Sequence, residues 1–515
     1  MARSLGLVVD PTLGAPLYQQ LFDRVVERIR SGAFPPGYRL PPTRTLAKEL
    51  GTHRNTIVRA YGELEEAGFL SSTVGRGTFV RAQPAPVAVP ANDPPSSEDE
   101  PSHVPTALPW SSLLADRSHA EAFARFHRIT RGAGRGEYIN LTRMQPSPDL
   151  VPDELFRRCI EHVLRTMGAR SLAYAPHEGV PRLREQIALD LARQGVPARS
   201  DDVLVTSGSQ QGIDVIARGL LEAGDTVLSQ SSTYTGAIQV FAASGARLEG
   251  VPSDDQGPQI AAATALSRGR CKAFYLLPNH CNPTGECITE ARRRELVRWS
   301  RERGVPLIED DYAADLELDG VSPPPALRAL DGDVLYLGTY SKKLFPALRV
   351  GFVLYPASLG PHLVALKHTT DLGGSAVLQH ALAEFLERGY LLAHLNRIRP
   401  EYRMRRDALA EALRRHLPSS MTFEVPPRGV TLWLPLPEGI APEHVFEEAK
   451  RRGLLVSPGT LNRVAEGRAG IRVTYCNEPI PRLVEGARRL GQVMEALSQK
   501  KRAPRAAHDE AMGMV

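Results

Sequence analysis

Apolar residues recur every three or four positions in three stretches near the N-terminus, at residues 17–29, 46–50 and 57–67. This spacing places the apolar side chains of each stretch on one face of an amphipathic helix. Thr43 precedes the second stretch, and we expect its hydroxyl to cap that helix. The turn between the second and third helices is short and contains glycine, which is typical of a helix-turn-helix.

A β-hairpin is predicted directly after the third helix. Residues 69–74 and 78–80 have the character of short strands, and a Gly-Arg-Gly turn lies between them. This turn places Arg76 at the hairpin tip, where its guanidinium can approach a groove. Three helices followed by a hairpin predict an N-terminal winged helix-turn-helix domain, which we assign to residues 1–81.

Residues 82–109 interrupt the regular pattern and divide the chain into a small and a large part. The segment is rich in proline, acidic in its middle and nearly free of aromatic residues. Such a composition buries too little apolar surface to offset the entropy lost on folding, so we predict a linker. The end of the chain is polar, and we expect residues 498–515 to form a flexible tail.

Short apolar strands alternate with helical segments in the large part, residues 110–497. The predicted strands are 203–206, 227–229, 273–277, 306–308, 334–337 and 350–354. This alternation predicts an α/β domain in which helices cover both faces of a mostly parallel sheet. We expect a smaller α+β subdomain at its C-terminal end, over about residues 390–497.

Composition limits the classes of protein to which the chain can belong. Of its 515 residues, 42% are hydrophobic and 23% are charged, which is typical of a globular chain of about two to four domains. It has no run of eighteen apolar residues, so we expect no membrane-spanning helix. The five cysteines are scattered, which favours reduced thiols and a cytosolic protein. Zinc ligands at His280, Cys281 and Cys287 would have poor spacing, so we predict no metal site.

Positive charge is concentrated on the predicted helix-turn-helix. Five basic residues and one acidic residue lie between Arg39 and Arg59, which gives a local charge of +4. An isolated basic helix more often simply faces solvent. Here the charge coincides with a helix-turn-helix and a wing arginine, so we predict binding to a double-stranded DNA operator. The residues expected to contact DNA are Arg44, Arg54, Asn55, Thr56, Arg59 and Arg76.

Chemically distinctive residues follow several strands of the predicted sheet. Ser209 and Gln210 begin a helix after the first strand, and the N–H groups at such a helix start can bind phosphate. Asn282, Asp310 and Lys342 follow later strands, and ligands bind where such strand ends meet. A lysine that bonds to an aldehyde, a carboxylate for a pyridine nitrogen and a phosphate site together suit pyridoxal 5′-phosphate (PLP). Each residue alone could be a cap, a surface pair or a solvated lysine, but their joint occurrence favours the cofactor.

The N-terminal motifs resemble the winged helix of GntR-type transcription regulators. The resemblance runs from about residue 16 to 81 and is carried by Arg-Leu-Pro-Pro-Thr-Arg-Thr-Leu-Ala at 39–47 and Leu-Gly-Thr-His-Arg-Asn-Thr-Ile at 50–57. It implies that Arg44 and the Arg-Asn-Thr motif contact DNA. His53 stands where serine is commoner in that family, so the operator sequence is left open.

The chain from about residue 138 to 497 resembles a fold type I, class I/II aminotransferase. The motifs that carry the resemblance are Asn282-Pro283-Thr284-Gly285, Asp310-x-Tyr312, Ser341-Lys342 and Leu348-Arg349-Val350-Gly351. It implies that PLP bonds to Lys342, with Asp310 at its pyridine nitrogen. The other implied contacts are Asn282 and Tyr312 at the phenolate oxygen, Ser209, Gln210, Ser341 and Arg349 at the phosphate, Tyr234 on the ring, and Tyr174 at a neighbouring subunit's phosphate.

Two assignments in this part carry an explicit alternative. Arg472 matches the arginine that binds a substrate carboxylate, and the alternative is a structural ion pair. Lys342 is preferred to Lys343 as the covalent lysine, but register alone separates the two residues.

A GntR winged helix, a long linker and an aminotransferase-like domain together resemble the MocR subfamily of bacterial regulators. The resemblance implies a head-to-tail homodimer whose large domain senses PLP, an amino acid or an amine. One alternative is an active aminotransferase that carries a DNA-binding module, because Asn282 is present although the subfamily often replaces it. Another is a PLP sensor that controls vitamin B6 synthesis. All three functions need the same cofactor residues, so the sequence does not distinguish them.

Overall fold

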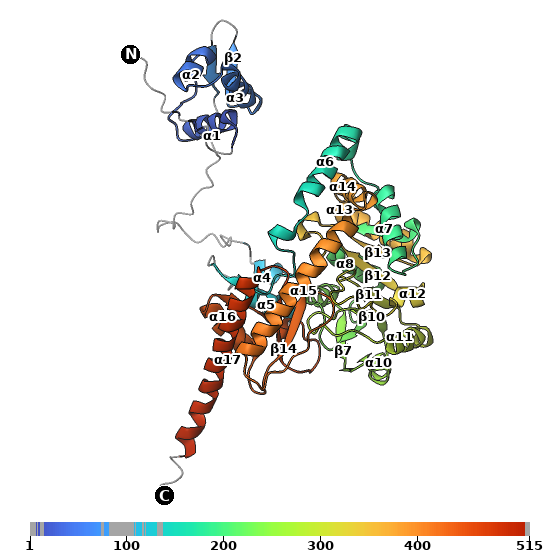
Figure 1. The fold of residues 1–515 in the computed structure, drawn as a ribbon. Helices are drawn as coiled ribbons and strands as arrows, with labels where there is room; N and C mark the ends of the chain where they lie inside the picture. The colour runs from blue at the N-terminus through green and yellow to red at the C-terminus, as the bar shows by residue number, and fades with distance from the viewer. Residues whose placement is uncertain are drawn as a thin grey trace, which may run out of the picture. The chain divides into compact units, whose positions relative to one another are not determined.

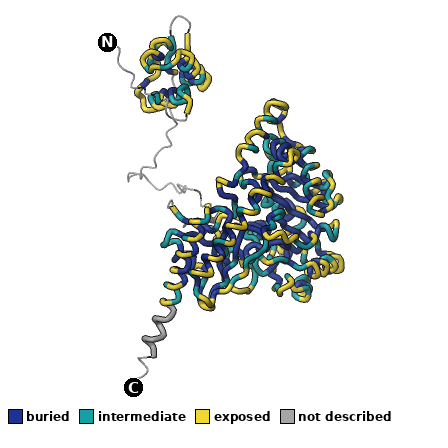
Figure 2. Tube along the Cα trace, in the orientation of Figure 1, coloured by how far each residue is buried: buried dark blue, intermediate teal, exposed yellow. Residues whose placement is uncertain are grey.

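The computed structural model describes residues 7, 9–10, 15–73, 77–81, 108, 110–115, 118, 120–130 and 137–509. The chain forms two compact units, residues 1–107 and residues 108–515 (Figure 1). Arg76, most of the predicted linker and the last part of the predicted tail lie outside the described residues. Each unit has its own buried core, drawn in dark blue in Figure 2.

Three helices and a small sheet form the first unit. The helices are α1 (Leu17–Arg30), α2 (Thr43–Glu49) and α3 (Arg54–Glu66), and the strands are β1 (Arg39–Leu40), β2 (Leu70–Thr73) and β3 (Gly77–Val80). Strand β3 lies between β1 and β2 and is antiparallel to both. Leu21, Leu46, Ile57 and Leu64 are fully buried in the core that the helices share. The predicted winged helix-turn-helix is therefore confirmed.

One local prediction for this unit was wrong, and one strand was not predicted. Thr43 does not cap α2, because it is the first helical residue and Pro42 stands at the cap position. Pro42 has a φ of −54°, which leads the chain into the helix without a hydroxyl cap. Strand β1 was missed because two residues are too few to show an alternating pattern. It forms where Arg39 pairs with Phe79 of β3.

A seven-stranded sheet forms the centre of the second unit. In spatial order its strands are β5 (Val203–Thr206), β13 (Gly351–Leu354), β12 (Leu335–Thr339), β11 (Leu307–Asp310), β10 (Cys271–Leu276), β6 (Thr226–Gln230) and β7 (Arg247–Val251). Strand β13 is antiparallel to both of its neighbours, and the remaining pairs are parallel. The predicted mostly parallel sheet is confirmed. Strand β7 was missed because Arg247 and Glu249 are exposed at the sheet edge and interrupt the apolar run.

Helices cover both faces of this sheet because successive side chains of a strand point to opposite faces. In β10, Ala273 and Tyr275 belong to one apolar cluster, whereas Phe274 and Leu276 belong to another. The first cluster includes side chains of α8 (Ser209–Leu220), α9 (Thr235–Ala243) and α13 (Gly360–Asp371). The second includes side chains of α10 (Ile260–Leu266), α11 (Glu290–Arg303) and α12 (Leu327–Leu330).

The C-terminal subdomain has its own antiparallel sheet, in the order β14-β17-β16. Its elements are α15 (Tyr390–His416), β14 (Thr431–Pro435), α16 (Pro442–Arg451), β16 (Ser457–Pro458), β17 (Gly470–Thr474) and α17 (Ile480–Asp509). Helix α17 packs against α15 and α16. It does not end at residue 497, where we placed the domain boundary, but continues as a helix to Asp509.

Further elements surround these two sheets. They are α4 (Trp110–Leu113), α5 (Glu121–Thr130), β4 (Ile139–Asn140), α6 (Asp153–Met167), α7 (Pro181–Arg193), β8 (Ser253–Asp254), β9 (Gly257–Pro258), α14 (Ala376–Glu387) and β15 (Leu454–Leu455). Strand β4 pairs with β15, which connects the start of the large unit to the C-terminal subdomain. Within the described parts of the chain, every helix is too short or too polar to cross a membrane.

Candidate functional site

The segments that follow β5, β6, β10, β11 and β12 meet at a cavity of about 120 Å³. The residues that line it are Met144, Gly208, Ser209, Gln210, Tyr234, Asn282, Asp310, Tyr312, Thr339, Ser341, Lys342, Pro346 and Arg349. All the residues predicted to hold the cofactor within one chain are in this set. Their convergence follows from the parallel strands, whose carboxyl ends lie at one edge of the sheet.

Asp310 is the last residue of β11 and is buried. Its Oδ2 accepts a hydrogen bond of 2.5 Å from the Tyr275 hydroxyl, whereas its Oδ1 is buried with no partner among the described residues. Burial raises the pKa of Asp310 to about 7, with a further increase from Asp311. A desolvated carboxylate with one unpaired oxygen is suited to a ligand that brings a proton or a positive charge to that oxygen.

The two adjacent lysines have different surroundings. Lys342 lines the cavity, and burial lowers its pKa, which favours the neutral, nucleophilic amine. The Nζ of Lys343 lies 2.6 Å from the Asp315 carboxylate instead. Burial opposes the charge on Lys343, but Asp315 and Asp190 raise its pKa overall, so Lys343 stays protonated in a buried ion pair.

One end of the cavity has the features of an anion site. Helix α8 begins there at Ser209 with no side-chain cap, so its first N–H groups are available to a ligand. Gly208 has a φ of 78°, and a Cβ at this position would lie 3.4 Å from the Arg349 guanidinium. Arg349 donates to the carbonyl of Ser207 at 2.8 Å, which fixes the guanidinium beside the helix start. Such an arrangement suits a phosphate group.

Arg472 on β17 contacts one of the residues that line the cavity. Its Nη1 donates to Oδ1 of Asn282 at 2.7 Å, and its Nη2 donates to the carbonyl of Thr142 at 3.2 Å. The Nε atom is buried with no partner, and none of the ion pairs among the described residues includes Arg472. The structural ion pair that we considered for Arg472 is thus not formed with any described residue.

Several unpaired buried polar atoms belong to residues that line this cavity or the compartment beside it. They include Asp310 Oδ1, Gln210 Oε1, the Tyr312 hydroxyl and Arg472 Nε. Native proteins pair most of their buried polar atoms, so a group of unpaired ones implies a missing partner. Burial raises the pKa of Tyr312 well above its ordinary value, which keeps its hydroxyl protonated as a donor. The residues present therefore fit a polar ligand that has both donors and acceptors.

Two cavity features were not predicted from the sequence. Tyr275 holds Asp310 in place, and Met144 lines the cavity from outside the strand ends. Tyr275 pairs with Ile308, two residues before Asp310, so the two side chains lie on the same face of neighbouring strands. The signal for Tyr275 was thus the pairing register of β10 and β11, which the sequence alone does not give.

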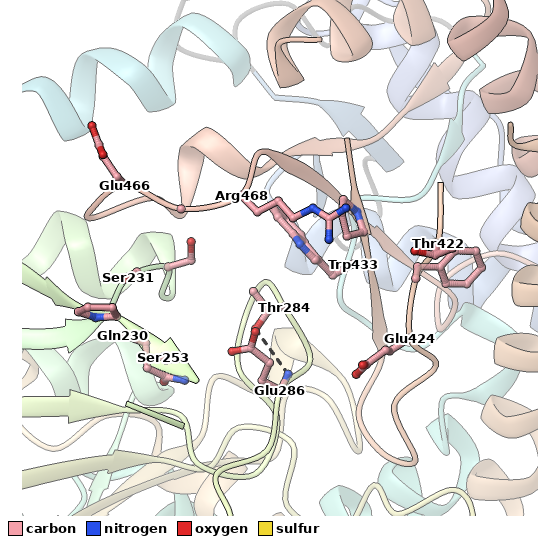
Figure 3. A pocket seen from close by; sticks show the side chains of 15 residues that line it. Gln230, Ser231, Ser253, Thr284, Glu286, Thr422, Glu424, Trp433, Glu466 and Arg468 are labelled. Atoms are coloured by element: carbon pink, nitrogen blue, oxygen red, sulfur yellow. Dashed lines mark hydrogen bonds between the residues drawn. The ribbon is translucent and has the colours of Figure 1, made fainter. Parts of the chain in front are cut away.

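Tyr174 is 85% exposed and does not line the cavity of its own chain. A separate cavity of about 580 Å³ also contains none of the predicted site residues (Figure 3). Its lining includes Glu286, Glu424 and Glu466, and none of the described residues that line it is a lysine. It therefore lacks the amine that a covalently held aldehyde cofactor requires.

In the first unit, the predicted DNA-contacting side chains occupy the surface of α2 and α3. Arg44, Arg54 and Asn55 are exposed, and Thr56 is half-buried. This exposure follows from the apolar stripe of α3, which turns the other side of the helix toward solvent. Arg59 is also exposed, but its guanidinium lies 3.7 Å from the ring centroid of Tyr18 and pairs with Glu63 at 3.1 Å. Arg59 is thus partly committed to contacts within the domain.

Comparison with known families agrees with both units. Residues 17–80 match the family described as bacterial regulatory proteins of the gntR family, and residues 138–490 match aminotransferase class I and II. The chain is 31% identical to the uncharacterized HTH-type transcriptional regulator YisV of Bacillus subtilis, over 89% of this chain and 92% of that protein. It is 30% identical to the probable rhizopine catabolism regulatory protein MocR of Rhizobium meliloti, over 88% of each chain.

Solved structures resemble the large unit. The α-aminoadipate aminotransferase of Thermus thermophilus, complexed with N-(5′-phosphopyridoxyl)-L-leucine, superposes with a TM-score of 0.70 at 30% identity. The match covers 76% of this chain and all of the aminotransferase, so a complete aminotransferase fold follows the DNA-binding unit. The chain therefore belongs to the MocR-type transcription regulators, in which a GntR-family helix-turn-helix domain is joined to an aminotransferase class I and II domain.

Proposed function

We propose that this protein is a PLP-dependent transcription regulator whose large unit responds to PLP, an amino acid or an amine. The observation that carries the proposal is one chain that combines a basic winged helix with a buried cavity containing Lys342 and unpaired polar atoms. The winged helix binds an operator in double-stranded DNA. The ligand that occupies the cavity then changes the affinity of the winged helix for that operator.

The cavity residues can each meet one part of PLP. When bound, PLP supplies an aldehyde that bonds reversibly to amines and a ring that accepts electrons. Lys342 provides the amine, and Asp310 keeps a proton at the pyridine nitrogen. The remaining roles are a donor pair from Asn282 and Tyr312 at the phenolate oxygen, phosphate contacts from Ser209, Gln210, Ser341 and Arg349, and ring stacking by Tyr234.

Arg472 can hold the acid end of an effector whose amine faces Lys342. A guanidinium has five N–H donors, and the described contacts of Arg472 engage two of its three nitrogens. We also propose a head-to-tail homodimer in which Tyr174 contacts the phosphate of the neighbouring subunit. The 85% exposure of Tyr174 in one chain supports that role.

A second candidate function is an active aminotransferase. The presence of Asn282 in the cavity and the complete aminotransferase fold favour it. Both functions begin with an amine at Lys342, so cofactor residues do not separate them. They differ in the product, because an aminotransferase releases a keto acid in many turnovers and a sensor does not.

The test is a titration of the full-length protein, loaded with PLP, with a panel of amino acids and amines. Visible absorption reports reaction at the cofactor, keto-acid assays report turnover, and binding to an operator selected from random duplexes reports regulation. A regulator changes its operator affinity with little keto acid. Sustained keto-acid formation with unchanged operator binding would favour the aminotransferase. A response to PLP alone would favour control of vitamin B6 synthesis.

A further inference from the structure

A second compartment adjoins the candidate cofactor cavity. Its volume is about 300 Å³, and Met144, Tyr234 and Asn282 line both spaces. The other residues that line it are Phe126, Thr142, Thr235, Phe446, Leu455, Val456, Ser457, Pro458, Leu461 and Arg472. An effector held between Lys342 and Arg472 would therefore place the rest of its structure in this compartment.

Apolar side chains from separate elements form most of the compartment wall. Phe446 lies on α16, Leu455 ends β15, and Val456 follows it; all three are buried. Leu461 ends the short 3-10 helix of residues 459–461, and Phe126 on α5 is 38% exposed. The wall is thus part of the protein core on one side and reaches the surface at Phe126.

Formal charge among the described residues that line this compartment is limited to one group. Within that described lining, Arg472 is the only lysine, arginine, aspartate or glutamate. The Thr235 hydroxyl is already used, because it donates to the carbonyl of Leu461 at 3.1 Å. One carboxylate can pair with Arg472, but a second charge would be removed from water with no partner.

We infer that the effector is an α-amino acid with one carboxylate and an uncharged, apolar side chain. The inference rests on the proposed function and names the ligand class of the same site. Phe126, Phe446, Leu455, Val456 and Leu461 determine specificity by contacting the side chain. Dicarboxylic amino acids and basic amino acids are rejected, because Arg472 is paired with the α-carboxylate and the described lining offers no other charge to compensate a second one.

Ligands of matched length test this inference on the full-length protein loaded with PLP. Norleucine, 2-aminoadipate and lysine have side chains of similar reach and differ mainly in terminal charge. The concentration for half-maximal change in visible absorption is measured for each, together with the shift in thermal unfolding temperature. We expect norleucine to act at a concentration about tenfold or more below the other two.

A homologous series provides a second, graded measurement. Alanine, 2-aminobutyrate, norvaline and norleucine differ by one methylene each. Each added methylene that enters an apolar compartment should lower the half-saturating concentration roughly 4-fold, or roughly 60-fold over the whole series. A flat series would show that the side chain stays outside the compartment.

The matched variants are Leu461→Arg and Leu189→Arg. Leu461→Arg adds a cation to the compartment while the Thr235 hydrogen bond, which uses the backbone, is kept. It should reverse the order of norleucine and 2-aminoadipate. Leu189 on α7 is 53% exposed and lies outside the compartment, so Leu189→Arg should respond like the wild type.

The possible outcomes separate this inference from the proposed function. If 2-aminoadipate or lysine acts at least as well as norleucine, the ligand class is wrong while the proposed function stands. The same holds if no α-amino acid changes the absorption of a protein that carries covalent PLP. A protein without that absorption overturns the proposed function itself, and the inference falls with it.

Discussion

The functional residues predicted for the two units lie in opposite environments. In the large unit, Asp310 is buried and Lys342 is half-buried, and both have shifted pKa values. Asp310 Oδ1 is itself buried with no partner among the described residues. In the winged helix, Arg44 and Arg54 are exposed on helix surfaces. A buried site with unpaired polar atoms indicates the chemistry of its ligand through the positions of those atoms. An exposed basic surface gives no such indication, so its assignment as a DNA-binding surface depends on the fold and the family.

This difference leads to different expectations for mutations. Residues around one buried cavity act together, so the loss of one of them should abolish a measured property of the site, such as its visible absorption, altogether. Residues on an exposed surface contribute separate, salt-screened contacts, and their effects should be partial and graded.

The largest effect is expected for Lys342→Ala. With PLP attached to Lys342 as proposed, the purified wild-type protein should be yellow, and the variant should lose this visible absorption completely. Absorption spectra before and after gel filtration measure covalent attachment, since loosely held PLP is removed by the column. Operator binding of the variant should persist but should no longer respond to PLP or an amino acid.

Lys343→Met is the matched control for that experiment. It should keep the visible absorption, because Lys343 pairs with Asp315 and does not line the cavity. It should lower the free energy of unfolding by up to about 3 kcal/mol, because the half-buried Asp315 loses its cation and keeps only the hydrogen bond from Gln194. The assignment of the two lysines would be reversed if folded Lys343→Met protein lacked the visible absorption and Lys342→Ala protein retained it.

The sequence predicted which residues come together at the large cavity, because they follow strand ends that parallel topology brings to one edge of the sheet. It could not show which way Lys342 and Lys343 face, since both follow β12 in a turn rather than in a strand with alternating sides. Nor could it find Tyr275, whose role depends on the register between two strands. The start of α2 at Thr43 was missed, because Pro42 stands at the cap position and leads into the helix through its backbone conformation, without a side-chain hydrogen bond.

The next effect concerns the acidity of Asp310 in the cofactor-free protein. Its folded pKa of about 7 lies above the ordinary 3.8, so between these values the folded state holds a proton that the unfolded state has released. Its contribution to stability is therefore lost as pH rises toward 7. Relative to Asp310→Asn, the wild type should lose roughly 3 kcal/mol of unfolding free energy between pH 5 and pH 8.

Urea denaturation of the two cofactor-free proteins at both pH values measures this difference. The asparagine variant keeps the side-chain volume and cannot ionise, so it isolates the carboxylate. An equal pH dependence of both proteins would show that Asp310 is already ionised without the cofactor. The carboxyl group of Asp310 would then behave like an ordinary solvated one, although it is buried.

In the winged helix, Arg54→Ala should have a smaller and more selective effect. Arg54 begins α3, and the N-terminal residues of a recognition helix reach base edges in the major groove. Its loss should cost roughly 1–3 kcal/mol of operator affinity and relax specificity at one position of each half-site. Competition binding with single-base operator variants measures both quantities. Arg24→Ala, on the exposed side of α1, serves as the control and should leave both unchanged.

The smallest effect is expected for Arg44→Ala. Arg44 lies in the first turn of α2, the first helix of the helix-turn-helix, which crosses the DNA backbone in such domains. A phosphate contact carries no base information, so affinity should fall alike for operator and random DNA, and the specificity ratio should stay constant. One fewer neutralised phosphate should reduce the slope of log affinity against log salt by about 0.9. If the variant instead loses specificity at one base pair while the salt slope is unchanged, Arg44 reads a base. The expectation that residues of an exposed surface make separate, salt-screened contributions to affinity would then be wrong for Arg44.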